Sequence, residues 1–252
     1  MKVGNPKVSI IIATYNSGKT LNAALDSVLN QAYQDWECIV VDGASKDNTI
    51  DIVRTYTEKD NRFRYISEPD KGVYDAFNKG WKIACGEWIH YLGSDDKLTP
   101  NGIADIMAAS HEDVELMTGH CYIEKIDGTI KPCMSQGYSG CHQGKLVRRS
   151  VLERFNGFNL SYPILADYDL MVRMEKAKVP IINVDTYVAY FAMSGMSQKL
   201  KWLIERFKER RIIMQEHGLP NVHYVSLKHI VRDFLSINYR MIKSRLQWTH
   251  FW

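Results

Sequence analysis

The strongest constraint on the fold comes from two short runs of apolar, largely β-branched residues. Residues 8–12 read VSIII and residues 38–41 read CIVV, with almost no polar residue between the apolar ones. Such runs are typical of parallel strands that are covered on both faces. Between them lies a segment, residues 19–30, with apolar side chains at helical spacing, namely Leu21, Ala24, Leu25, Val28 and Leu29. The pattern predicts a β-α-β unit.

The same alternation continues to residue 92. Helices are expected at residues 49–56 and 73–85, and strands at residues 63–67 and 88–92. Four strands that alternate with three helices predict a doubly wound α/β fold, with a mainly parallel central sheet and helices on both faces. The length of 252 residues and the hydrophobic content of 45% suffice for the core of such a fold.

The second half of the chain has a mixed pattern. Thr99 and Pro100 suit the cap and first turn of a helix, and Asp127 and Gly128 mark the turn of a hairpin over residues 123–132. The other expected elements are a helix at residues 167–177, a strand at 180–191, and helices at about 200–217 and 226–246. The last two helices form a basic C-terminal extension, because residues 199–252 carry 11 Lys and Arg against 4 Asp and Glu.

Several classes of protein lack support in the sequence. The N-terminal segment MKVGNPKVSIIIATYN has no small-residue cleavage site, and no apolar run reaches the ~20 residues that span a bilayer. Five scattered cysteines without a CxxC motif indicate neither a disulfide framework nor a zinc site, which favours a reducing cytoplasm. A protease site at Cys141 and His142 is disfavoured, because adjacent residues rarely form a working thiol and imidazole pair.

Polar residues follow each of the four expected strands. In open α/β sheets ligands bind beyond the carboxyl ends of the strands. The segments there are 14–16 (TYN), 42–45 (DGAS), 68–72 (EPDKG) and 94–96 (SDD). Because these residues are acidic, a phosphorylated ligand needs a bridging divalent cation, for which Mg²⁺ or Mn²⁺ is the natural choice. Neither a GxxxxGK[ST] loop nor a GxGxxG motif is present.

Five motifs in this order carry a resemblance to a known family. They read VSIIIATYNSGKTL, CIVVDGASKDNT, SEPDKGVYDAFNKG, GEWIHYLGSDD and ADYDLMVRM, and they span roughly residues 7–190. The chain resembles the family 2 glycosyltransferases, inverting enzymes of the A-type glycosyltransferase (GT-A) fold that use nucleotide-diphosphate sugars. The third motif is most similar to bacterial enzymes that build capsule, exopolysaccharide or O-antigen. The resemblance implies a catalytic domain at 1–198, with a nucleotide-binding half at about 1–98 and an acceptor-binding half at about 99–198.

The resemblance also implies roles for residues in the first half. Tyr15 would stack on the nucleotide base, Asp42 would hydrogen-bond the base, and Asp95 would approach the ribose. The other expected nucleotide contacts are Thr14 and Asn16. Asp96 would coordinate the metal. Phe77 stands where many relatives have an arginine, so for contacts to the diphosphate or sugar the candidates are Lys71, Asp75 and Asn78. The alternatives are a solvated turn for Asp95 and Asp96, and core packing for Tyr15.

The general base is expected in the motif LADYDL. Ala166 replaces an acidic residue of the family there, and Asp167, in the first turn of the expected helix, is the predicted base. Asp169 lies two positions on and would point elsewhere, with a sugar contact as its weaker assignment. By resemblance, His142 and Gln143 would hydrogen-bond a donor or acceptor sugar.

The resulting hypothesis is a metal-dependent glycosyltransferase. Its donor would be a nucleotide-diphosphate sugar, UDP-linked by expectation, and its acceptor a saccharide or a polyprenyl-diphosphate-linked saccharide in bacterial surface polysaccharide biosynthesis. Rival hypotheses are a sugar nucleotidyltransferase and a catalytically silent carbohydrate-binding scaffold. Residues 223–252 would pack on the body or contact the cytoplasmic face of the inner membrane; nucleic acid is not expected as a partner. The sequence leaves the oligomeric state open.

Overall fold

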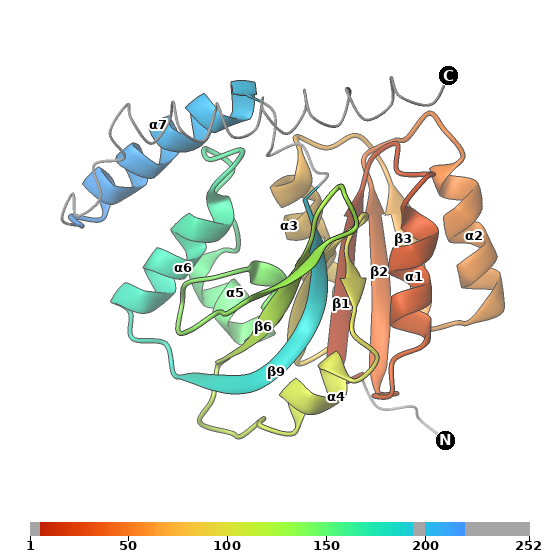
Figure 1. Cartoon of the computed structure of the whole chain (residues 1–252), viewed down its shortest axis with the longest axis horizontal. Coiled ribbons are helices and arrows are strands. Elements are labelled where there is room, and N and C mark those ends of the chain that lie inside the picture. Colours follow the sequence, from red (N-terminus) through yellow and green to blue (C-terminus); the bar gives the residue numbers. More distant parts are fainter. Residues whose placement is uncertain (1–5, 194–199, 220–252) are drawn as a thin grey trace. The chain divides into compact units, whose positions relative to one another are not determined.

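The computed structural model describes residues 6–193 and 200–219 (Figure 1). Contacts divide the chain into two compact units, Met1–Ser194 and Gly195–Trp252. In the second unit, helix α7 spans Leu200–Glu216, where the sequence predicts a helix at about 200–217. The helix expected at 226–246, and the membrane contact expected for 223–252, lie outside the described residues.

The first half of the larger unit has the predicted parallel sheet. Its strands stand in the order β3-β2-β1-β4, and all three pairings are parallel. The elements, in chain order, are β1 (Val8–Thr14), α1 (Leu21–Leu29), β2 (Trp36–Asp42), α2 (Thr49–Lys59), β3 (Phe63–Ser67), α3 (Val73–Ile83) and β4 (Trp88–Gly93). Each predicted strand and helix of this half is therefore confirmed, with shifts of a few residues at its ends.

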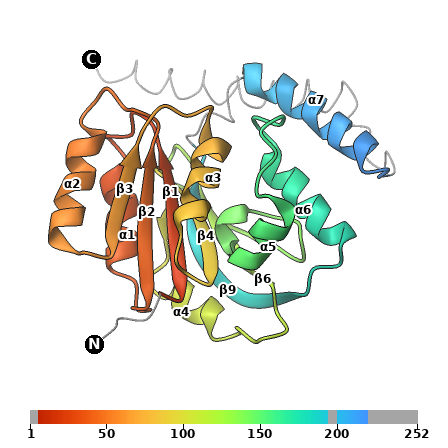
Figure 2. The same cartoon turned by 180° about the vertical axis from the view of Figure 1, so that it is seen from behind.

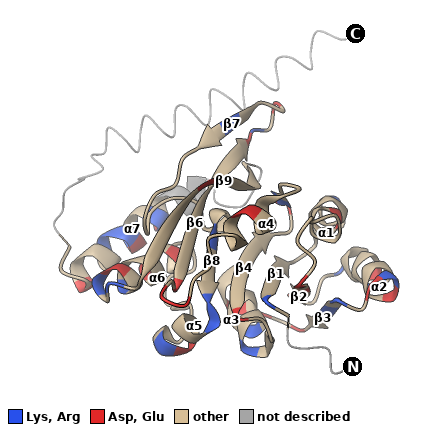
Figure 3. Cartoon of the chain, turned by 90° about the horizontal axis from the view of Figure 1, so that it is seen from below, with Lys and Arg blue, Asp and Glu red and all other residues tan. Residues whose placement is uncertain are grey.

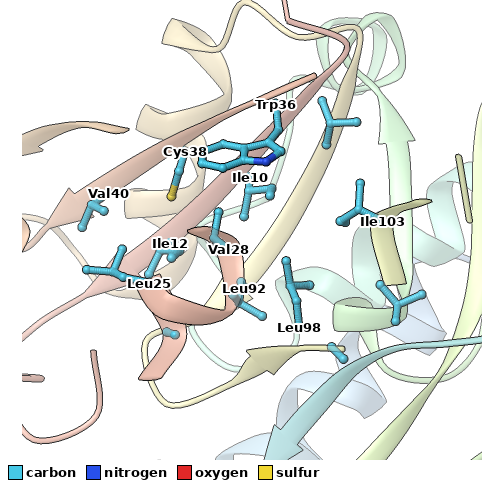
Figure 4. Close-up of a cluster of buried hydrophobic side chains, with 14 of the residues drawn as sticks. Ile10, Ile12, Leu25, Val28, Trp36, Cys38, Val40, Leu92, Leu98 and Ile103 are labelled. Atoms are coloured by element: carbon cyan, nitrogen blue, oxygen red, sulfur yellow. The ribbon is translucent and has the colours of Figure 1, made fainter. Parts of the chain in front are cut away.

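Helices cover both faces of this sheet. On one face, Ile10, Ile12 and Val40 pack in one buried cluster with Leu25 and Val28 of α1 (Figure 4). Figure 2 shows α3 on the opposite face. There Gly80 approaches β1 so closely that a Cβ atom would lie 2.4 Å from a methyl carbon of Ile11, which explains the glycine in the middle of the helix. The alternate residues of β1 are thus buried on opposite sides.

The second half extends the sheet from β4. The order continues β4-β8-β6-β9-β5, and β7 pairs with β6. The elements are β5 (Lys97–Leu98), α4 (Gly102–Met107), β6 (Leu116–Glu124), β7 (Ile130–Cys133), the 3-10 helix η1 (His142–Gly144), β8 (Lys145–Arg148), α5 (Arg149–Phe155), α6 (Ala166–Lys176) and β9 (Ile181–Ala192). The hairpin predicted at 123–132 is confirmed as part of β6 and β7, whereas β5, β8 and α5 were not predicted.

The expected fold is confirmed, with a parallel first half and a mixed second half in which β6 and β9 also pair in parallel. Among the described strands, β8 pairs antiparallel with both β4 and β6, and β5 pairs antiparallel with β9. Strands β6 and β7 also pair antiparallel, because a short hairpin joins them.

A buried polar contact lies where the two halves join. His90 of β4 is fully buried, and its Nδ1 lies 3.1 Å from the backbone oxygen of Lys145 in β8. Burial lowers the pKa of His90 to about 4, so the imidazole is neutral at pH 7. The ammonium group of Lys145 is also buried, and it donates to Thr118 Oγ1 and to the backbone oxygens of Gly137 and Ser139.

Charged side chains are distributed unevenly among the elements. In Figure 3 strands β1 and β4 carry no Lys, Arg, Asp or Glu, whereas α2, α5 and α7 carry both signs. Among the described residues no helix is both long enough and apolar enough to cross a membrane.

Candidate active site

Thr14 and Asp42 lie side by side at the carboxyl ends of β1 and β2. They are partners in the strand register, and Gly43 N donates to the backbone oxygen of Thr14 at 2.9 Å. Asp42 is fully buried, and its carboxylate accepts hydrogen bonds from Ser45 N, Ser45 Oγ and Ser67 Oγ. The buried hydroxyl of Thr14 has no protein partner, which leaves one polar atom at this strand end for a ligand.

Tyr15 and Asn16 form the loop that follows β1. The Tyr15 side chain is 61% exposed, so the alternative that it packs in the core is wrong. Asn16 adopts a left-handed backbone with φ 51°, a conformation that asparagine tolerates better than most residues. Its Oδ1 accepts from Lys46 N at 2.8 Å and its N donates to Ser45 Oγ. Asn16 therefore fastens the β1 loop to the β2 loop and leaves the Tyr15 ring facing solvent.

The Asp95 and Asp96 pair follows β4. Asp96 is 2% exposed, which excludes a solvated turn at this position, whereas Asp95 is half-buried. Asp96 Oδ2 accepts from Gln143 Nε2 at 2.8 Å and from Gly93 N, and Oδ1 accepts from Ala192 N. A Cβ atom at Gly93 would lie 2.6 Å from Asp96 Oδ2, so the turn needs glycine there.

Burial raises the pKa of Asp96 to about 6, only partly opposed by the hydrogen bond from Ala192. A nearby cation would favour its charged form. A carboxylate has about four lone-pair positions, and three of those on Asp96 are used by protein donors, so it can give one bond to a metal. Among the described residues no group of three His, Cys, Asp or Glu could hold a metal by itself. One or two carboxylates with the remaining ligands from phosphate and water suit Mg²⁺ or Mn²⁺.

Asp167 lies in the first turn of α6, as the sequence predicts for its helix. Its Oδ1 accepts from Tyr74 Oη at 2.9 Å and from Tyr168 N, and its Oδ2 lies 3.2 Å from His142 Nδ1. Burial alone would raise the pKa of Asp167, but the hydrogen bond and positive charge of His142 lower it below its usual value. The same pairing raises the pKa of His142, against the effect of burial. Asp167 is therefore held as a carboxylate.

The 3-10 helix η1 brings the two acidic sites together. Its first residue, His142, contacts Asp167, and its second, Gln143, donates to Asp96. Both side chains were predicted to contact sugar, but the structure gives each of them a carboxylate partner from a distant part of the chain. One turn of backbone thus contacts both Asp96 and Asp167.

The sequence analysis did not predict a contact that Asp167 makes with Tyr74, in the first turn of α3. Its hydroxyl bridges the backbone oxygen of Ile164 and Asp167 Oδ1, both at 2.9 Å. Nothing in the local sequence points to this contact, because the two residues are far apart along the chain. Phe77, one turn later, is 1% exposed and packs against Tyr91 and Phe158, so an aromatic cluster lies where the resemblance led us to expect an arginine.

Two predicted sugar contacts have structural partners instead. Asn78 is buried, donates to Phe158 O, and accepts from Phe158 N and Trp81 Nε1. Asp169 is 2% exposed and forms an ion pair with Arg173 at 2.8 Å. These contacts occupy the groups that a sugar would need, which argues against both assignments.

Lys71 and Asp75 lie at the amino end of α3. Asp75 accepts from the backbone N of Lys71 at 3.0 Å, and Lys71 itself is exposed. Asp70 adjoins them; burial raises its pKa, and its carboxylate lies against Gly43, where a Cβ atom would be 2.6 Å from Asp70 Oδ2. The β2 and β3 loops therefore meet at the same edge as the Asp42 carboxylate.

A polar hollow of about 390 Å³ lies elsewhere in the molecule. It includes Lys7, Glu87 and Arg148, at the opposite ends of β1 and β4 from the acidic residues. Glu87 forms ion pairs with both Lys7 and Arg148, so the charges compensate each other there. Glu112 also lines this hollow, so its two carboxylates face two basic side chains, and none of the residues expected to contact nucleotide, metal or sugar lies there.

A comparison with known families identifies the architecture. The sequence profile described as "Glycosyl transferase family 2" matches residues 9–168, which include the predicted nucleotide, metal and base residues. The chain belongs to glycosyltransferase family 2. As a glycosyltransferase it has the GT-A fold predicted from the sequence.

A curated relative supports the assignment. The chain is 33% identical to the "PGL/p-HBAD biosynthesis glycosyltransferase" of Mycobacterium bovis (strain BCG / Pasteur 1173P2) over 177 residues, which cover 67% of this chain and 69% of the relative. At this level of identity the aligned segment shares the family's fold and motifs.

Two solved structures share the fold of this glycosyltransferase. The mannosyltransferase PcManGT from Pyrobaculum calidifontis, in complex with GDP-Man and Mn²⁺, has a TM-score of 0.69 at 18% identity, and covers 93% of this chain and 70% of that chain. S. aureus TarS 1–349 in complex with UDP-GlcNAc has a TM-score of 0.65 at 19% identity, and covers 93% of this chain and 73% of that chain. This chain spans 43% of a longer TarS chain.

Proposed function

We propose that this glycosyltransferase moves a sugar from a nucleotide-diphosphate donor, UDP-linked, to a hydroxyl of a saccharide or polyprenyl-diphosphate-linked saccharide in bacterial surface polysaccharide biosynthesis. The observation that carries the proposal is the pair of carboxylates, Asp96 and Asp167, fastened to the two adjacent side chains of η1. Transfer needs one acidic site for a metal-bound leaving group and a separate one for proton removal. The site offers both.

The nucleotide is assigned to the edge formed by β1, β2 and β4. The exposed Tyr15 ring would stack on the base, a contact worth about 1–3 kcal/mol for base–aromatic pairs. Thr14, Asn16 and Asp42 would line the base site, and Asp95 would approach the ribose. The hydrogen bond between Ser17 Oγ and Ser94 Oγ, 2.8 Å long, supports this arrangement because it joins the loops of Tyr15 and Asp95.

A divalent cation, Mn²⁺ or Mg²⁺, is assigned to Asp96. When bound, it supplies positive charge to the leaving diphosphate. Asp96 would hold it through its remaining lone pair, and Gln143 and the backbone N of Ala192 keep the carboxylate oriented. Lys71 and Asp75, at the amino end of α3, are weaker candidates for contacts to the diphosphate or sugar.

Asp167 is assigned as the general base of an inverting transfer. The acceptor oxygen attacks the anomeric carbon as its proton passes to a carboxylate oxygen of Asp167, and the bond from the anomeric carbon to the diphosphate oxygen breaks. Tyr74 and His142 hold the carboxylate in place before the reaction, which reduces the cost of orientation. Their hydrogen bonds also keep Asp167 ionised and able to accept the proton.

Calorimetry of nucleotide binding tests this proposal. UDP, GDP, CDP and dTDP are titrated with Mn²⁺ or Mg²⁺ and then with a chelator, into the native protein and the Asp96→Ala variant. We expect metal-dependent binding of UDP that is lost in Asp96→Ala and retained in Asp113→Ala, which removes an exposed carboxylate of the loop before β6. Equal binding with chelator would contradict the role of Asp96.

Activity assays with the same protein distinguish the proposed transferase from the rival functions. Slow hydrolysis of one nucleotide-sugar donor is expected from a transferase without its acceptor, whereas a silent scaffold would leave every donor intact. A nucleotidyltransferase would instead form a nucleotide-sugar and pyrophosphate from a sugar phosphate and a nucleoside triphosphate.

Residues 223–252 are proposed to contact an anionic membrane surface near the acceptor. Unchanged vesicle binding after removal of these residues would contradict that contact.

A further inference from the structure

Three of the five cysteines lie together behind the candidate active site. Cys121 is in β6, Cys133 ends β7, and Cys141 is the residue before η1. Cys121 and Cys133 are direct partners in the register of β6 and β7, and the sulfur atoms of Cys133 and Cys141 are 3.9 Å apart. Cys121 is fully buried, whereas Cys133 and Cys141 are partly exposed.

The surroundings of the cluster favour one thiolate. A hydrogen bond from the Cys121 thiol lowers the pKa of Cys141 to about 6, although burial acts against it. A hydrogen bond from Cys133 and the positive charge of His142 lower the pKa of Cys141 further. Burial raises the pKa of Cys133, and the pKa of Cys121 is raised chiefly by its bond to Cys141. The buried ammonium group of Lys145 also interacts with Cys121 and Cys141. Cys141 is therefore the nucleophile of the cluster.

The cluster adjoins the residues that hold both carboxylates. Cys141 is bonded through the backbone to His142, which contacts Asp167, and His142 is followed by Gln143, which contacts Asp96. We propose that Cys133 and Cys141 form an oxidisable thiol pair, which a small-molecule disulfide such as oxidised glutathione converts to an intramolecular disulfide that slows glycosyl transfer. The effect on transfer rests on the proposed roles of Asp96 and Asp167, whereas the formation of the bond does not.

The reaction proceeds by two exchanges. The Cys141 thiolate attacks one sulfur of oxidised glutathione, which forms a mixed disulfide and releases one glutathione thiolate. Cys133 then loses its proton to solvent and attacks the Cys141 sulfur, which forms the Cys133–Cys141 bond and releases the second glutathione. Two protein thiols are oxidised, and one glutathione disulfide is reduced to two thiols.

The bond requires movement at η1 or β7. Disulfide sulfur atoms are about 2.05 Å apart, so the two sulfurs must approach by roughly 2 Å. The loop between them is held at several points: Gly137 O accepts from Thr118 and Lys145, and Gly137 N donates to Asn183. Since the middle of the loop is fixed, the displacement falls on its ends, one of which is Cys141. A shift there changes the positions of His142 and Gln143.

Peptide mapping gives a direct readout of the bond. The full chain is treated with oxidised glutathione, its free thiols are alkylated, and trypsin is added. Cys133 and Cys141 lie in one tryptic peptide, residues 126–145, since Pro132 blocks cleavage after Lys131. We expect this peptide to be two hydrogen atoms lighter and unalkylated. A disulfide that joins it to the peptide of Cys121, or the absence of any disulfide, would overturn the proposal.

Activity is measured in the same samples. We expect transfer to fall about tenfold or more on oxidation, since misplacement of catalytic groups by an ångström carries penalties of that size, and to recover with dithiothreitol. Cys133→Ser should form at most a mixed disulfide at Cys141 and should remain at least half as active after oxidation. The exposed cysteine outside the cluster provides the matched control, Cys85→Ser, which should respond like the native protein.

The remaining outcomes separate the two proposals. A mapped Cys133–Cys141 bond with unchanged transfer would overturn the regulatory effect. Equal inhibition of Cys133→Ser and native protein would assign the effect to a mixed disulfide at Cys141 or to another thiol, and would overturn the role of the Cys133–Cys141 bond. If the reduced protein shows no transfer at all, the proposed function fails, while the peptide map still decides whether the thiol pair forms.

Discussion

The two halves of the larger unit hold their acidic residues in different ways. Asp42, in the parallel half, accepts from Ser45 in the loop after β2 and from Ser67 at the end of β3, both at the same sheet edge. Asp167, in the mixed half, depends on Tyr74 and His142, which α3 and η1 bring from distant parts of the chain. The site at the parallel edge is therefore a local property of strand ends, whereas the proposed base requires the complete fold.

The difference matters for function because the two halves carry different tasks in the proposed reaction. A nucleotide site made from strand ends is set as soon as β1, β2 and β4 pair. The chemistry requires α3, η1 and α6 to meet correctly. Substitutions in the two halves should therefore separate binding from turnover.

The largest separation is expected from Asp167→Asn. The variant keeps the size of the side chain but removes the proton acceptor, and a general base contributes about 10²- to 10⁴-fold to rate. We expect kcat to fall about 10³-fold with the nucleotide Kd unchanged, measured by product formation and calorimetry. Asp42→Asn is the matched variant in the other half, and its main effect should be on the nucleotide Kd rather than on kcat. Full turnover in Asp167→Asn would contradict the proposal that the mixed half supplies the general base while the parallel half binds the nucleotide.

The junction of the halves should be sensitive to acid through His90. Its pKa is lowered from 6.5 to about 4 in the folded protein, so the unfolded chain takes up the proton first as the pH falls. The stability present above pH 6.5 should therefore decrease between pH 6.5 and 4, by about 3 kcal/mol from this group. Urea unfolding as a function of pH measures this loss.

His90→Asn provides the control for the junction, because it retains a donor toward the backbone oxygen of Lys145 but does not titrate. The variant should lose less stability than the native protein over the same pH range. Identical pH dependence in both proteins would show that the junction is not the acid-sensitive element.

The smallest effects are expected from two matched hydroxyl deletions. Ser67→Ala removes one hydrogen bond to Asp42, and Tyr74→Phe removes one to Asp167. Hydrogen bonds to charged groups are worth about 1.5–3 kcal/mol, so each change should be about tenfold or somewhat more. We expect Ser67→Ala to raise the nucleotide Kd and Tyr74→Phe to lower kcat. If both variants changed the same parameter, the two carboxylates would act as one site.

The same contrast explains what the sequence could predict. Residues 8–12, 38–41 and 88–92 are largely apolar, so these strands and the residues that follow them were predicted, including Thr14, Asp42 and Asp96. Strand β8 has only four residues and α5 only seven, too few for a clear periodic pattern. Tyr74 was missed because its contact with Asp167 is long-range. Asp169 and Asn78 were assigned to sugar because a motif gives position but not side-chain direction.

Phe77 has a consequence for how this protein responds to its medium. The resemblance in the sequence led us to expect an arginine at this point of α3, but here an aromatic side chain is buried. The neighbouring Lys79 already pairs with Glu68. Asp42, Asp70, Asp95 and Asp96 thus add to the negative charge of any diphosphate. In the proposed reaction the countercharge would come from Lys71 and from dissolved ions, so the salt and divalent-ion composition of the medium would affect how well the donor is captured.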